Sequence, residues 1–592
     1  MIQGKKLLPF GEIPESFKGL KDKGIYYTDK TDFISYLIHQ KRNICVFTRP
    51  RRFGKTLMLR TLQTFFEYAL DKDGNPIDNR HYFEGLKVMD GGDKVLGEMG
   101  KYPVISLSFK DVSGDTYEEL VGQLRDAVWR ACVAHKAWFK SSNVLSDGEK
   151  QILQTYQDGT ASDEHLKQFL GKYCQWLNDV TDSQSVILLD EYDVPLQKAA
   201  IYDLHHPGSE LFDKTVGLIG KFISAGFKSN ENLAYGIIAG CMRVAKESVF
   251  TGMNNPGVIT VLDDIPNEYW GFTESEVKQM IEYYHIENWY DRIEQWYDGY
   301  FYSGRKVFNP WSLLNAIRGI VNGYGENAIK AYWGQTSGNA IIDEMIDRNP
   351  QHREALANLM NGATMTVPVF DNLSYRDLEK NPDAIWSFLL YTGYLKAVEI
   401  KKNEDELRMA EVAVPNTEVY TIMKSSMRDW WENIQISGYN TKPLVIALAS
   451  GDEETIEREL RLVLKSSMSV FDYNEAFYHG MVVGLLRTIA VVNSNREYGE
   501  GRPDIVTVIG DKGIILELKC VTPHALEVAG IKDNDRVRIN NMMSSKLDEA
   551  VKQIHNNDYV AAVLDDEPEA LSVMAYAVCF CKKRCMVHKV DV

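Results

Sequence analysis

The feature that most constrains the fold is a short apolar strand that runs through a basic turn into a helix. Residues Asn43–Thr48 (NICVFT) have the apolar character of a buried strand. From Lys55 onwards, apolar residues recur at helical spacing in LMLRTLQTFFEYAL. Between them, Gly54, Lys55 and Thr56 match the second half of the phosphate-loop pattern G-x-x-x-x-G-K-[ST], and Arg49 stands where its first glycine is expected.

This arrangement predicts a site for the phosphates of a nucleoside triphosphate, because backbone N–H groups at a helix N-terminus point at an anion. We expect Lys55 to neutralise the β- and γ-phosphates, and the Thr56 hydroxyl to bind Mg²⁺. The tripeptide G-K-T alone also occurs by chance, so the prediction depends on the strand before it and the helix after it. The predicted nucleotide-binding residues of the loop are Arg49, Pro50, Arg51, Arg52, Phe53, Gly54, Lys55, Thr56 and Leu57.

A second apolar strand, Val186–Glu191 (VILLDE), ends in two acids. In phosphate-loop enzymes an aspartate at such a strand end holds Mg²⁺, so we predict that Asp190 binds the metal and the nucleotide. Glu191 is then placed to polarise the attacking water as general base. The competing interpretation is a strand that ends in a solvated acidic turn. The presence of both elements in this order, each at a strand end, argues against it.

Further strands are expected at Tyr102–Phe109 and Leu233–Gly240, with a long, mostly helical stretch at about 117–180. Strands that alternate with helices predict an α/β fold with a parallel sheet covered on both faces. Arg243 follows the last of these strands and is our candidate sensor of the γ-phosphate. Its alternative is a structural arginine.

A different pattern begins near Glu475, with a helix (NEAFYHGMVVGLL) and then three strands in IAVVNS, DIVTVIG and GIILELK. A helix at Lys546–His555 and a strand at Tyr559–Val563 are expected next. We therefore predict three parts. Residues 1–330 form a phosphate-loop unit with a helical insertion, 331–464 a mainly helical connection, and 465–592 a small α/β unit.

Three polar residues stand out in the last part: Asp504 before one strand, and Glu517 and Lys519 in the next. Residues two apart in a strand share a face, so Glu517 and Lys519 are expected on one side and Leu518 in the core on the other. The competing interpretation is a salt-bridged hairpin face. Hydrolysis of a phosphodiester needs a hard cation and a nucleophilic water. Acids at the ends of adjacent strands can converge on one such cation.

This P-D…E-x-K spacing resembles the PD-(D/E)XK nuclease superfamily. The resemblance implies that Asp504 and Glu517 hold Mg²⁺ and that Lys519 positions or activates the attacking water. It also suggests Glu475, in the preceding helix, as a further metal ligand and Gln553 as an auxiliary residue. Related folds can bind without cutting, so nuclease activity stays open.

The segments YYTDKTDFI, FTRPRRFGKTL, VILLDEYD and GCMRVAKESVFTGMNN resemble the AAA-ATPase-like family of bacterial proteins, as do WYDGYFYSGRKVFNPWSLL and FLLYTGYL. The form F-x-R-P-R-R-F-G-K-[ST] is specific to that family, which makes Arg49 a family variant of the missing glycine. The resemblance implies an AAA-like fold and ATP binding.

The formal net charge of −17 counts against an obvious nucleic-acid binder, although a basic cleft can sit on an acidic protein. The eight cysteines are scattered, which suits reduced thiols. Cys579, Cys581, Cys585 and His588 lack the paired spacing of a standard zinc site. No apolar run approaches the ~18 residues of a membrane helix, and the first residues lack a signal core. We expect a cytoplasmic protein without a membrane partner.

The leading hypothesis is an ATP-binding protein and ATPase, coupled to a Mg²⁺-dependent nuclease-like module that acts on DNA. The alternative is a nucleotide-gated binding or signalling protein whose nuclease-like fold recognises a partner without cleavage. A third interpretation is an accessory ATPase of a mobile element or of repair, with a decayed nuclease. The sequence leaves oligomerisation open, because no residue is identified as an arginine supplied in trans.

Overall fold

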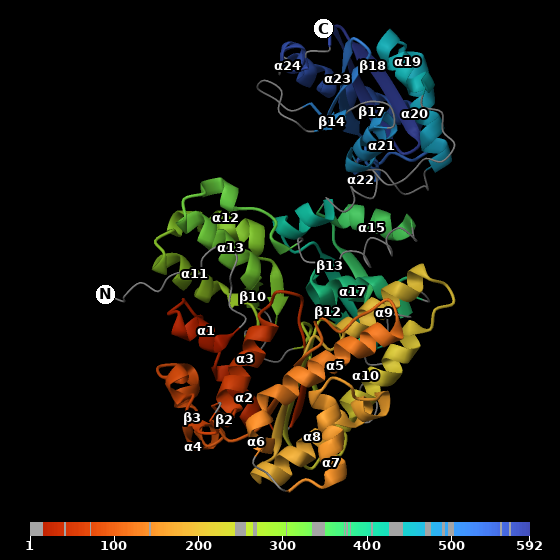
Figure 1. Ribbon diagram of the computed structural model, residues 1–592. Coiled ribbons are helices and arrows are strands. Elements are labelled where there is room, and N and C mark those ends of the chain that lie inside the picture. The colour runs from red at the N-terminus through yellow and green to blue at the C-terminus, as the bar shows by residue number, and fades with distance from the viewer. Residues whose placement is uncertain are drawn as a thin grey trace. The chain divides into compact units, whose positions relative to one another are not determined.

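Contacts along the chain divide it into two units, each with its own core. The first unit contains residues 1–337 and 364–421, and the second contains residues 338–363 and 422–592. The predicted boundaries at 330 and 464 stay predictions. The computed structural model (Figure 1) describes residues 16–40, 43–71, 73–140, 144–242, 256–263, 269–302, 305–333, 350–360, 362–371, 373, 377–378, 381–403, 406–424, 442–467, 475–487, 492–494, 503–556, 559–567 and 570–592.

Five parallel strands form the centre of the first unit, which confirms the predicted α/β fold. In order across the sheet they are β4 (Val104–Ser108), β5 (Ser185–Asp190), β6 (Leu233–Gly240), β1 (Ile44–Thr48) and β7 (Gly257–Ile259). β5 and most of β6 are buried, as expected of parallel strands covered on both faces. The order places β6 between β1, which leads into the predicted phosphate loop, and β5, which ends in the predicted acids.

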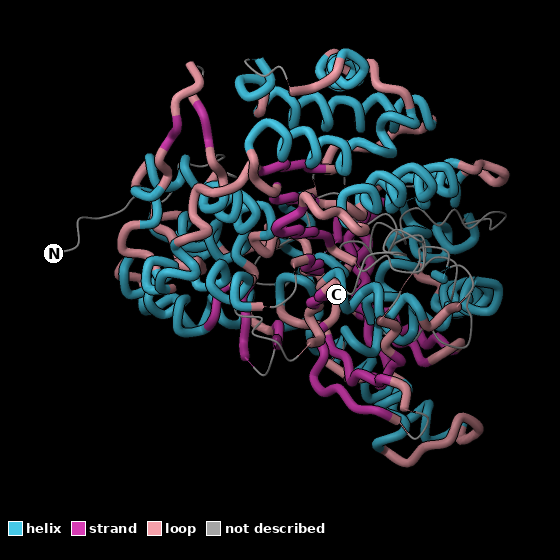
Figure 2. Tube along the Cα trace, turned by 90° about the horizontal axis from the view of Figure 1, so that it is seen from below, coloured by secondary structure: helices cyan, strands magenta, loops and turns pink. Residues whose placement is uncertain are grey.

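Helices cover both faces of this sheet (Figures 1 and 2). One face carries α2 (Asp32–His39) and α3 (Lys55–Phe66), and the other carries α5 (Tyr117–Ala134), α8 (Asp163–Thr181) and α10 (Leu211–Phe227). The side chains of β5 alternate accordingly. Val186 and Leu188 share a core with α3, whereas Ile187 points to Gly226 of α10.

Two glycines allow α8 and α10 to pack closely on the second face. A Cβ at Gly171 would lie 2.7 Å from the carbonyl oxygen of Ala225, and a Cβ at Gly226 would lie 2.7 Å from the Cβ of Leu170. Glycine at both positions lets the two helix backbones approach, which brings their apolar stripes together over the sheet.

Shorter elements surround the sheet and form three further small sheets, β8-β10-β9, β11-β13-β12 and β2-β3. The second of these lies in the range predicted to be mainly helical, and its strands were not anticipated. The elements are α1 (Phe17–Asp22), β2 (Ala69–Leu70), β3 (Pro76–Ile77), η1 (Arg80–Phe83), η2 (Lys87–Asp90), α4 (Gly92–Leu96), α6 (Lys136–Lys140), α7 (Asp147–Gln157), α9 (Val194–His205), β8 (Phe272–Thr273), α11 (Glu274–Tyr283), η3 (Glu287–Trp289), α12 (Tyr290–Tyr297), β9 (Tyr300–Tyr302), β10 (Arg305–Phe308), α13 (Pro310–Val321), η4 (Gly325–Ala328), β11 (Met365–Pro368), α17 (Ala384–Thr392), β12 (Lys396–Lys402) and β13 (Arg408–Ala413).

The second unit is built on a five-stranded sheet whose strands follow chain order: β14 (Val492–Ser494), β15 (Ile505–Ile509), β16 (Lys512–Cys520), β17 (Ser572–Cys581) and β18 (Arg584–Val590). Only the β16–β17 pair is parallel among these described pairs. One face carries α19 (Lys442–Ser450), α20 (Glu453–Ser467) and α21 (Glu475–Arg487), and the other carries α22 (Pro523–Val528), α23 (Arg536–Asn556) and α24 (Tyr559–Asp566). Helix α15 (Pro350–Met360) also belongs to this unit.

The predicted helix at the start of this unit and the three strands after it are confirmed, as is the helix at Lys546–His555. The predicted strand at Tyr559–Val563 is wrong, because these residues begin helix α24. A short apolar run can be a strand or a buried helix segment, and periodicity does not separate the two.

All eight cysteines are free thiols, as expected. Among the residues that the structure describes, no helix is long and apolar enough to cross a membrane.

Buried His135, after α5, gives the first unit a testable pH dependence. Its Nδ1 lies 3.3 Å from the Tyr173 hydroxyl, and burial lowers its pKa to about 4. Between pH 6.5 and about 4, His135 is therefore protonated in the unfolded chain but neutral in the folded chain. The free energy of unfolding that is present at neutral pH decreases as the pH falls through this window. The loss attributable to this group is at most about 3 kcal/mol.

We expect the substitution His135→Gln to flatten the fall in the melting temperature of the first unit between pH 6.5 and 4.5, measured by calorimetry. The exposed His81 is the matched control, and His81→Gln should keep the wild-type slope. An unchanged slope in His135→Gln would contradict the buried, neutral state of this ring.

Candidate functional site

The chain turns between β1 and α3 through a loop that presents the N-terminus of α3. Helix α3 begins at Lys55, and its N-cap is Gly54, which has a φ of 82° and no side chain to occupy the first N–H groups. Arg52 also has a positive φ, of 66°. The left-handed turns therefore fall at Arg52 and Gly54. Since Arg49 is not among the residues with positive φ, its position does not require the glycine of the usual pattern.

Lys55 folds back over this loop. Its ammonium group donates hydrogen bonds to the carbonyl oxygens of Arg49 at 2.8 Å and Pro50 at 2.9 Å, and the side chain is buried. The positive charge is thus held at the centre of the loop, beside the open N-terminus of α3. Both features favour a polyanion at this point.

The central contact of the site joins α3 to the end of β5. The Thr56 hydroxyl donates a hydrogen bond of 2.6 Å to Oδ2 of Asp190. The other carboxylate oxygen, Oδ1, is buried and has no hydrogen-bond partner among the described residues. Burial raises the pKa of Asp190, while the bond from Thr56 and the charge of Lys55 oppose the rise. A buried, unpaired carboxylate oxygen beside a hydroxyl fits a hard cation such as Mg²⁺.

Glu191 follows directly and takes a left-handed backbone conformation, with a φ of 53°. Burial and then the charge of Asp190 raise the pKa of its carboxyl, and Lys55 lowers it. Non-glycine residues rarely adopt this conformation, and such strain tends to be kept where a side chain has to be aimed. A carboxyl whose pKa moves toward neutrality is suited to act as a general base.

The two residues after Glu191 fix the chain that follows β6. Asp193 Oδ2 accepts hydrogen bonds from the backbone N–H groups of Cys241 at 2.9 Å and Met242 at 3.0 Å. The buried Tyr192 donates its hydroxyl to the carbonyl oxygen of Met242. Sequence reasoning assigned no role to this pair. Arg243, the predicted γ-phosphate sensor, comes next in the chain but lies outside the described residues.

The loop arginines are each engaged by the protein. The buried Arg49 guanidinium donates to the carbonyl oxygens of Thr48 at 2.7 Å and Ile259 at 3.1 Å, so its side chain braces β1 against β7. Arg51 donates to Gln197 at 2.9 Å, and Arg52 lies 4.3 Å from the centre of the Trp311 ring. The structure therefore gives the Arg49 side chain a bracing position within the sheet.

Remote segments of the first unit support the loop from outside. Phe53 packs edge-on against Tyr300 at 5.1 Å, and the Tyr300 hydroxyl donates to the carbonyl oxygen of Gly393. A Cβ at Gly393 would lie 2.9 Å from Pro50, so only glycine allows this approach. Trp333 Nε1 donates to the Arg51 carbonyl oxygen at 3.2 Å. The segments WYDGYFY and FLLYTGYL thus meet at the loop.

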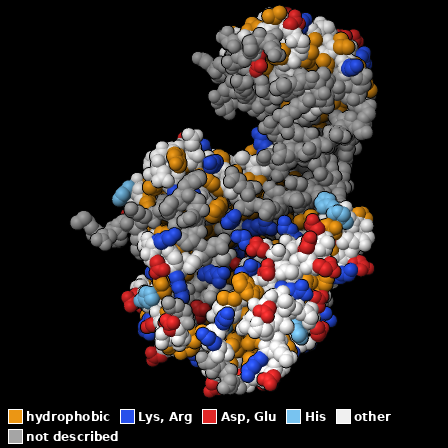
Figure 3. Space-filling model, viewed as in Figure 1, with side chains coloured by type: hydrophobic (Ala, Val, Ile, Leu, Met, Phe, Trp, Pro, Cys, Tyr) orange, Lys and Arg blue, Asp and Glu red, His pale blue; other side chains and the backbone are white. Residues whose placement is uncertain are grey.

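Charge is unevenly spread over the acidic chain. On the face shown in Figure 3, Lys and Arg side chains gather near the middle of the first unit, although the formal net charge is −17. A local positive field can attract an anionic ligand despite an overall negative charge.

In the second unit, β16 carries the predicted acid and base on one face. Glu517 is fully buried, and its Oε1 accepts a hydrogen bond of 2.9 Å from Lys519 Nζ. Leu518 lies in the opposite core, as predicted. Asp504, just before β15, reaches across and accepts the Leu518 N–H at 2.8 Å through Oδ2. On α21, His479 Nε2 lies 2.9 Å from the Asp504 carbonyl oxygen, a support that sequence reasoning missed.

This pair of acids has the electrostatics of a cation site. Burial and the charge of Asp504 raise the pKa of Glu517 well above its usual range, while Lys519 opposes the rise. Glu517 Oε2 is buried and has no hydrogen-bond partner among the described residues. As with Asp190 in the first unit, such an oxygen fits a hard cation.

Glu475, on α21, is exposed, but its charge interacts with Asp504 and Lys519. Gln553 lies on α23. Within the described part of the chain, no group of three or more His, Cys, Asp or Glu side chains is assembled to hold a metal. Mg²⁺ commonly binds through one or two carboxylates and keeps several waters, so two acids suffice for it. The thiols of Cys579 and Cys581 lie in one core and that of Cys585 in the other.

Comparison with known proteins supports both resemblances. Residues 13–250 match the family described as "Predicted AAA-ATPase", and residues 473–590 match the PD-(D/E)XK nuclease superfamily. A relative from Azotobacter chroococcum mcd 1, described as "Uncharacterized protein in vnfD 5'region", is 26% identical over 358 residues. That alignment spans 60% of this chain and 59% of the relative, which is less than two thirds of the relative's length. No solved structure matches the chain.

The contact between β6 and the acidic turn predicts the effect of one added methyl group. A Cβ at Gly240 would lie 2.5 Å from the Tyr192 ring and 2.6 Å from Asp193 Oδ1. We expect Gly240→Ala to lower the stability of the first unit by about 1–3 kcal/mol, measured by chemical denaturation. A Cβ at Gly217, inside α10, would meet no atom within 4 Å, so Gly217→Ala should be neutral or stabilising. Equal effects of the two substitutions would contradict this packing.

Proposed function

We propose that the chain is an ATPase whose first unit binds and hydrolyses ATP with Mg²⁺, and whose second unit is a Mg²⁺-dependent nuclease that acts on DNA. The observation that carries the ATPase is the hydrogen bond from Thr56 to Asp190, beside a buried carboxylate oxygen without a protein partner among the described residues. The nuclease rests on the same feature at Glu517, next to Asp504 and Lys519. The matches of the two segments to an ATPase family and a nuclease superfamily support both halves.

In the first unit, the N-terminus of α3 and Lys55 would bind the phosphates, and Thr56 and Asp190 would hold Mg²⁺. When bound, the metal would neutralise developing charge on the phosphates. Glu191 would accept a proton from the attacking water, because its raised pKa lies closer to neutrality than that of an ordinary carboxyl. Asp193 would hold the chain after β6 in place beside these residues, because it accepts a hydrogen bond from the Cys241 N–H.

In the second unit, Asp504 and Glu517 would hold Mg²⁺, whose chemistry is to polarise the scissile phosphate and a bound water. Lys519 is bonded to Glu517 and stands at the border of the buried site, so it can orient a water or stabilise the charged phosphate. The Leu518 N–H holds the Asp504 carboxylate by a hydrogen bond. Cleavage would thus need both acids ionised and the lysine charged.

The hydrolytic role of Glu191 predicts a separation of binding from turnover. We expect Lys55→Ala to abolish ATP binding in calorimetry, because the charge at the centre of the loop is lost. Glu191→Gln should bind ATP like wild type but hydrolyse it on the order of 10²–10⁴ times more slowly, measured by phosphate release. Glu231→Gln, an exposed substitution, is the control and should leave turnover unchanged. Wild-type turnover in Glu191→Gln would show that Glu191 is not the general base.

The nuclease half is tested by incubating the full chain with DNA, Mg²⁺ and ATP. We expect cleavage by wild type and a loss of at least about 100-fold in Glu517→Gln, which keeps the shape of the side chain but removes its charge. Glu527→Gln, which changes an exposed residue of α22, is the matched control. Cleavage by Glu517→Gln at the wild-type rate would show that Glu517 is not part of the nuclease site. No cleavage by wild type would favour the nucleotide-gated binding protein instead.

A further inference from the structure

The chain leaves the first unit at two points, and a buried residue stands shortly before each. The division between the units falls after residue 337 and again after residue 421. Trp333 precedes the first of these exits, and Glu418 precedes the second. Both side chains are buried within the first unit. The two exits are far apart in the sequence, so any link between them has to come from tertiary contacts.

Glu418 provides such a link. Its Oε1 accepts hydrogen bonds from the backbone N–H groups of Tyr332 at 2.8 Å and Trp333 at 3.0 Å. Residues 417–424 are helical, so the stretch that begins beside Glu418 continues past the division between the units. A change in the position of Glu418 would therefore act on backbone that belongs to the second unit.

The start of this helical stretch is anchored in the first unit. The Thr417 hydroxyl donates a hydrogen bond of 3.0 Å to the carbonyl oxygen of Gln295. A Cβ at Gly299, which has a φ of 121°, would overlap the carbonyl oxygen of Pro415, so only glycine allows this approach. The segment that carries Glu418 is thus held at its beginning.

Trp333 connects the same link to the phosphate loop. Its indole Nε1 donates to the carbonyl oxygen of Arg51 at 3.2 Å, and its ring centre lies 4.6 Å from that of Tyr394. The C=O and N–H of a trans peptide point in opposite directions, so this bond also sets the direction of the Arg52 N–H. Since an anion at a helix N-terminus is bound by backbone N–H groups, the orientation of the loop peptides matters to it.

We propose that nucleotide binding at the loop is transmitted through Trp333 and Glu418 to the chain that enters the second unit. The inference rests on the proposed function, because it takes the phosphate site as given. A nucleotide that fixes the loop strengthens the bond from Trp333 to Arg51, and two groups that stabilise one conformation stabilise each other. Trp333 and Glu418 then hold both exits more firmly, which is how the nucleotide state would reach the nuclease site.

Hydrogen–deuterium exchange of the full chain with Mg²⁺, with and without a non-hydrolysable ATP analogue, tests this proposal. In wild type, the analogue should slow exchange in peptides that cover residues 329–333 and 417–424. The expected slowing is roughly 2- to 10-fold, which corresponds to the strength of one hydrogen bond. Calorimetry on the same samples reports whether the analogue binds.

The variant Trp333→Phe removes the indole N–H but keeps a ring against Tyr394, and it should lose the slowing at 417–424. The matched control is Trp176→Phe in α8. Trp176 is also buried, and its Nε1 donates to Glu149 at 3.1 Å, so the substitution removes a bond of similar length. This control should keep the slowing.

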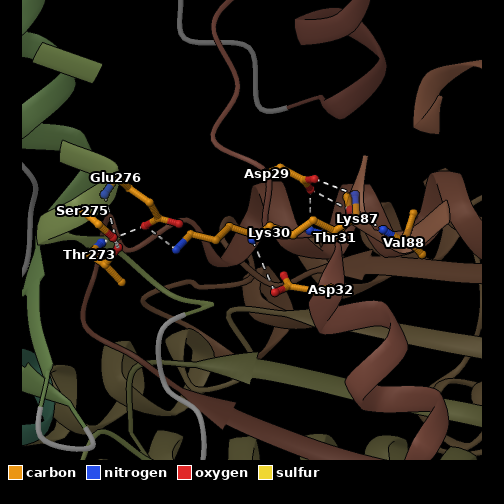
Figure 4. Close-up of polar contacts among 9 residues, drawn as sticks. All are labelled: Asp29, Lys30, Thr31, Asp32, Lys87, Val88, Thr273, Ser275 and Glu276. Carbon is orange, nitrogen blue, oxygen red and sulfur yellow. Dashed lines mark hydrogen bonds and ion pairs between the residues drawn. The ribbon is translucent and has the colours of Figure 1, made fainter. Parts of the chain in front are cut away.

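The variant Glu418→Leu removes the acceptor and should also lose the slowing at 417–424, whereas Glu418→Gln keeps an oxygen at this position and should retain it. Glu276→Leu is the control for a lost glutamate. Glu276 joins Lys30 at 2.7 Å and the Thr273 N–H at 2.8 Å, and so ties α11 to the segment before α2 (Figure 4). This control should keep the slowing.

Wild-type slowing at 417–424 in Trp333→Phe overturns the proposed link and leaves the phosphate site standing. A wild-type chain that binds the analogue without slowed exchange at 417–424 has the same meaning, as does loss of the slowing in Trp176→Phe. Failure of wild type to bind the analogue in calorimetry overturns the proposed function itself, and the link with it.

Discussion

The hydrogen bond between Thr56 and Asp190 is the contact that the architecture of the first unit has to make possible. It joins the start of α3 to the end of β5, although β6 separates β5 from β1 in the sheet. For the two side chains to meet, β1, β5 and β6 must be parallel and end together, so that their carboxyl ends form one edge. The helices on both faces and the glycines between α8 and α10 hold that edge in place.

Both candidate sites have the same arrangement around a buried carboxylate. Each places a carboxylate in a buried position, gives one oxygen a protein partner and leaves the other without a partner among the described residues. Burying such an oxygen costs free energy unless a cation compensates it. In each site a neighbouring lysine, Lys55 or Lys519, is held by hydrogen bonds within the protein. The resulting arrangement suits anions that arrive with a divalent metal.

The elements that carry strong local patterns were predicted from the sequence, and the residues of the loop and the acids lie at the ends of those elements. The sequence did not predict β11–β13, because β12 is largely exposed and lacks a simple apolar alternation. Nor could it predict that Arg49 braces the sheet, since the partner carbonyl belongs to Ile259, far away in the chain. The contacts of Trp311 with Arg52 and of Gly393 with Pro50 have the same origin: they are tertiary contacts that no local spacing encodes.

A double-mutant cycle on Thr56 and Asp190 tests the central claim most directly. Affinity for ATP with Mg²⁺ is measured by calorimetry in wild type, Thr56→Val, Asp190→Asn and the double variant. If the two side chains act as one metal-binding pair, the loss in the double variant falls short of the sum of the single losses by about 0.5–3 kcal/mol. Losses that add, or an affinity unaffected by either substitution, would contradict the account.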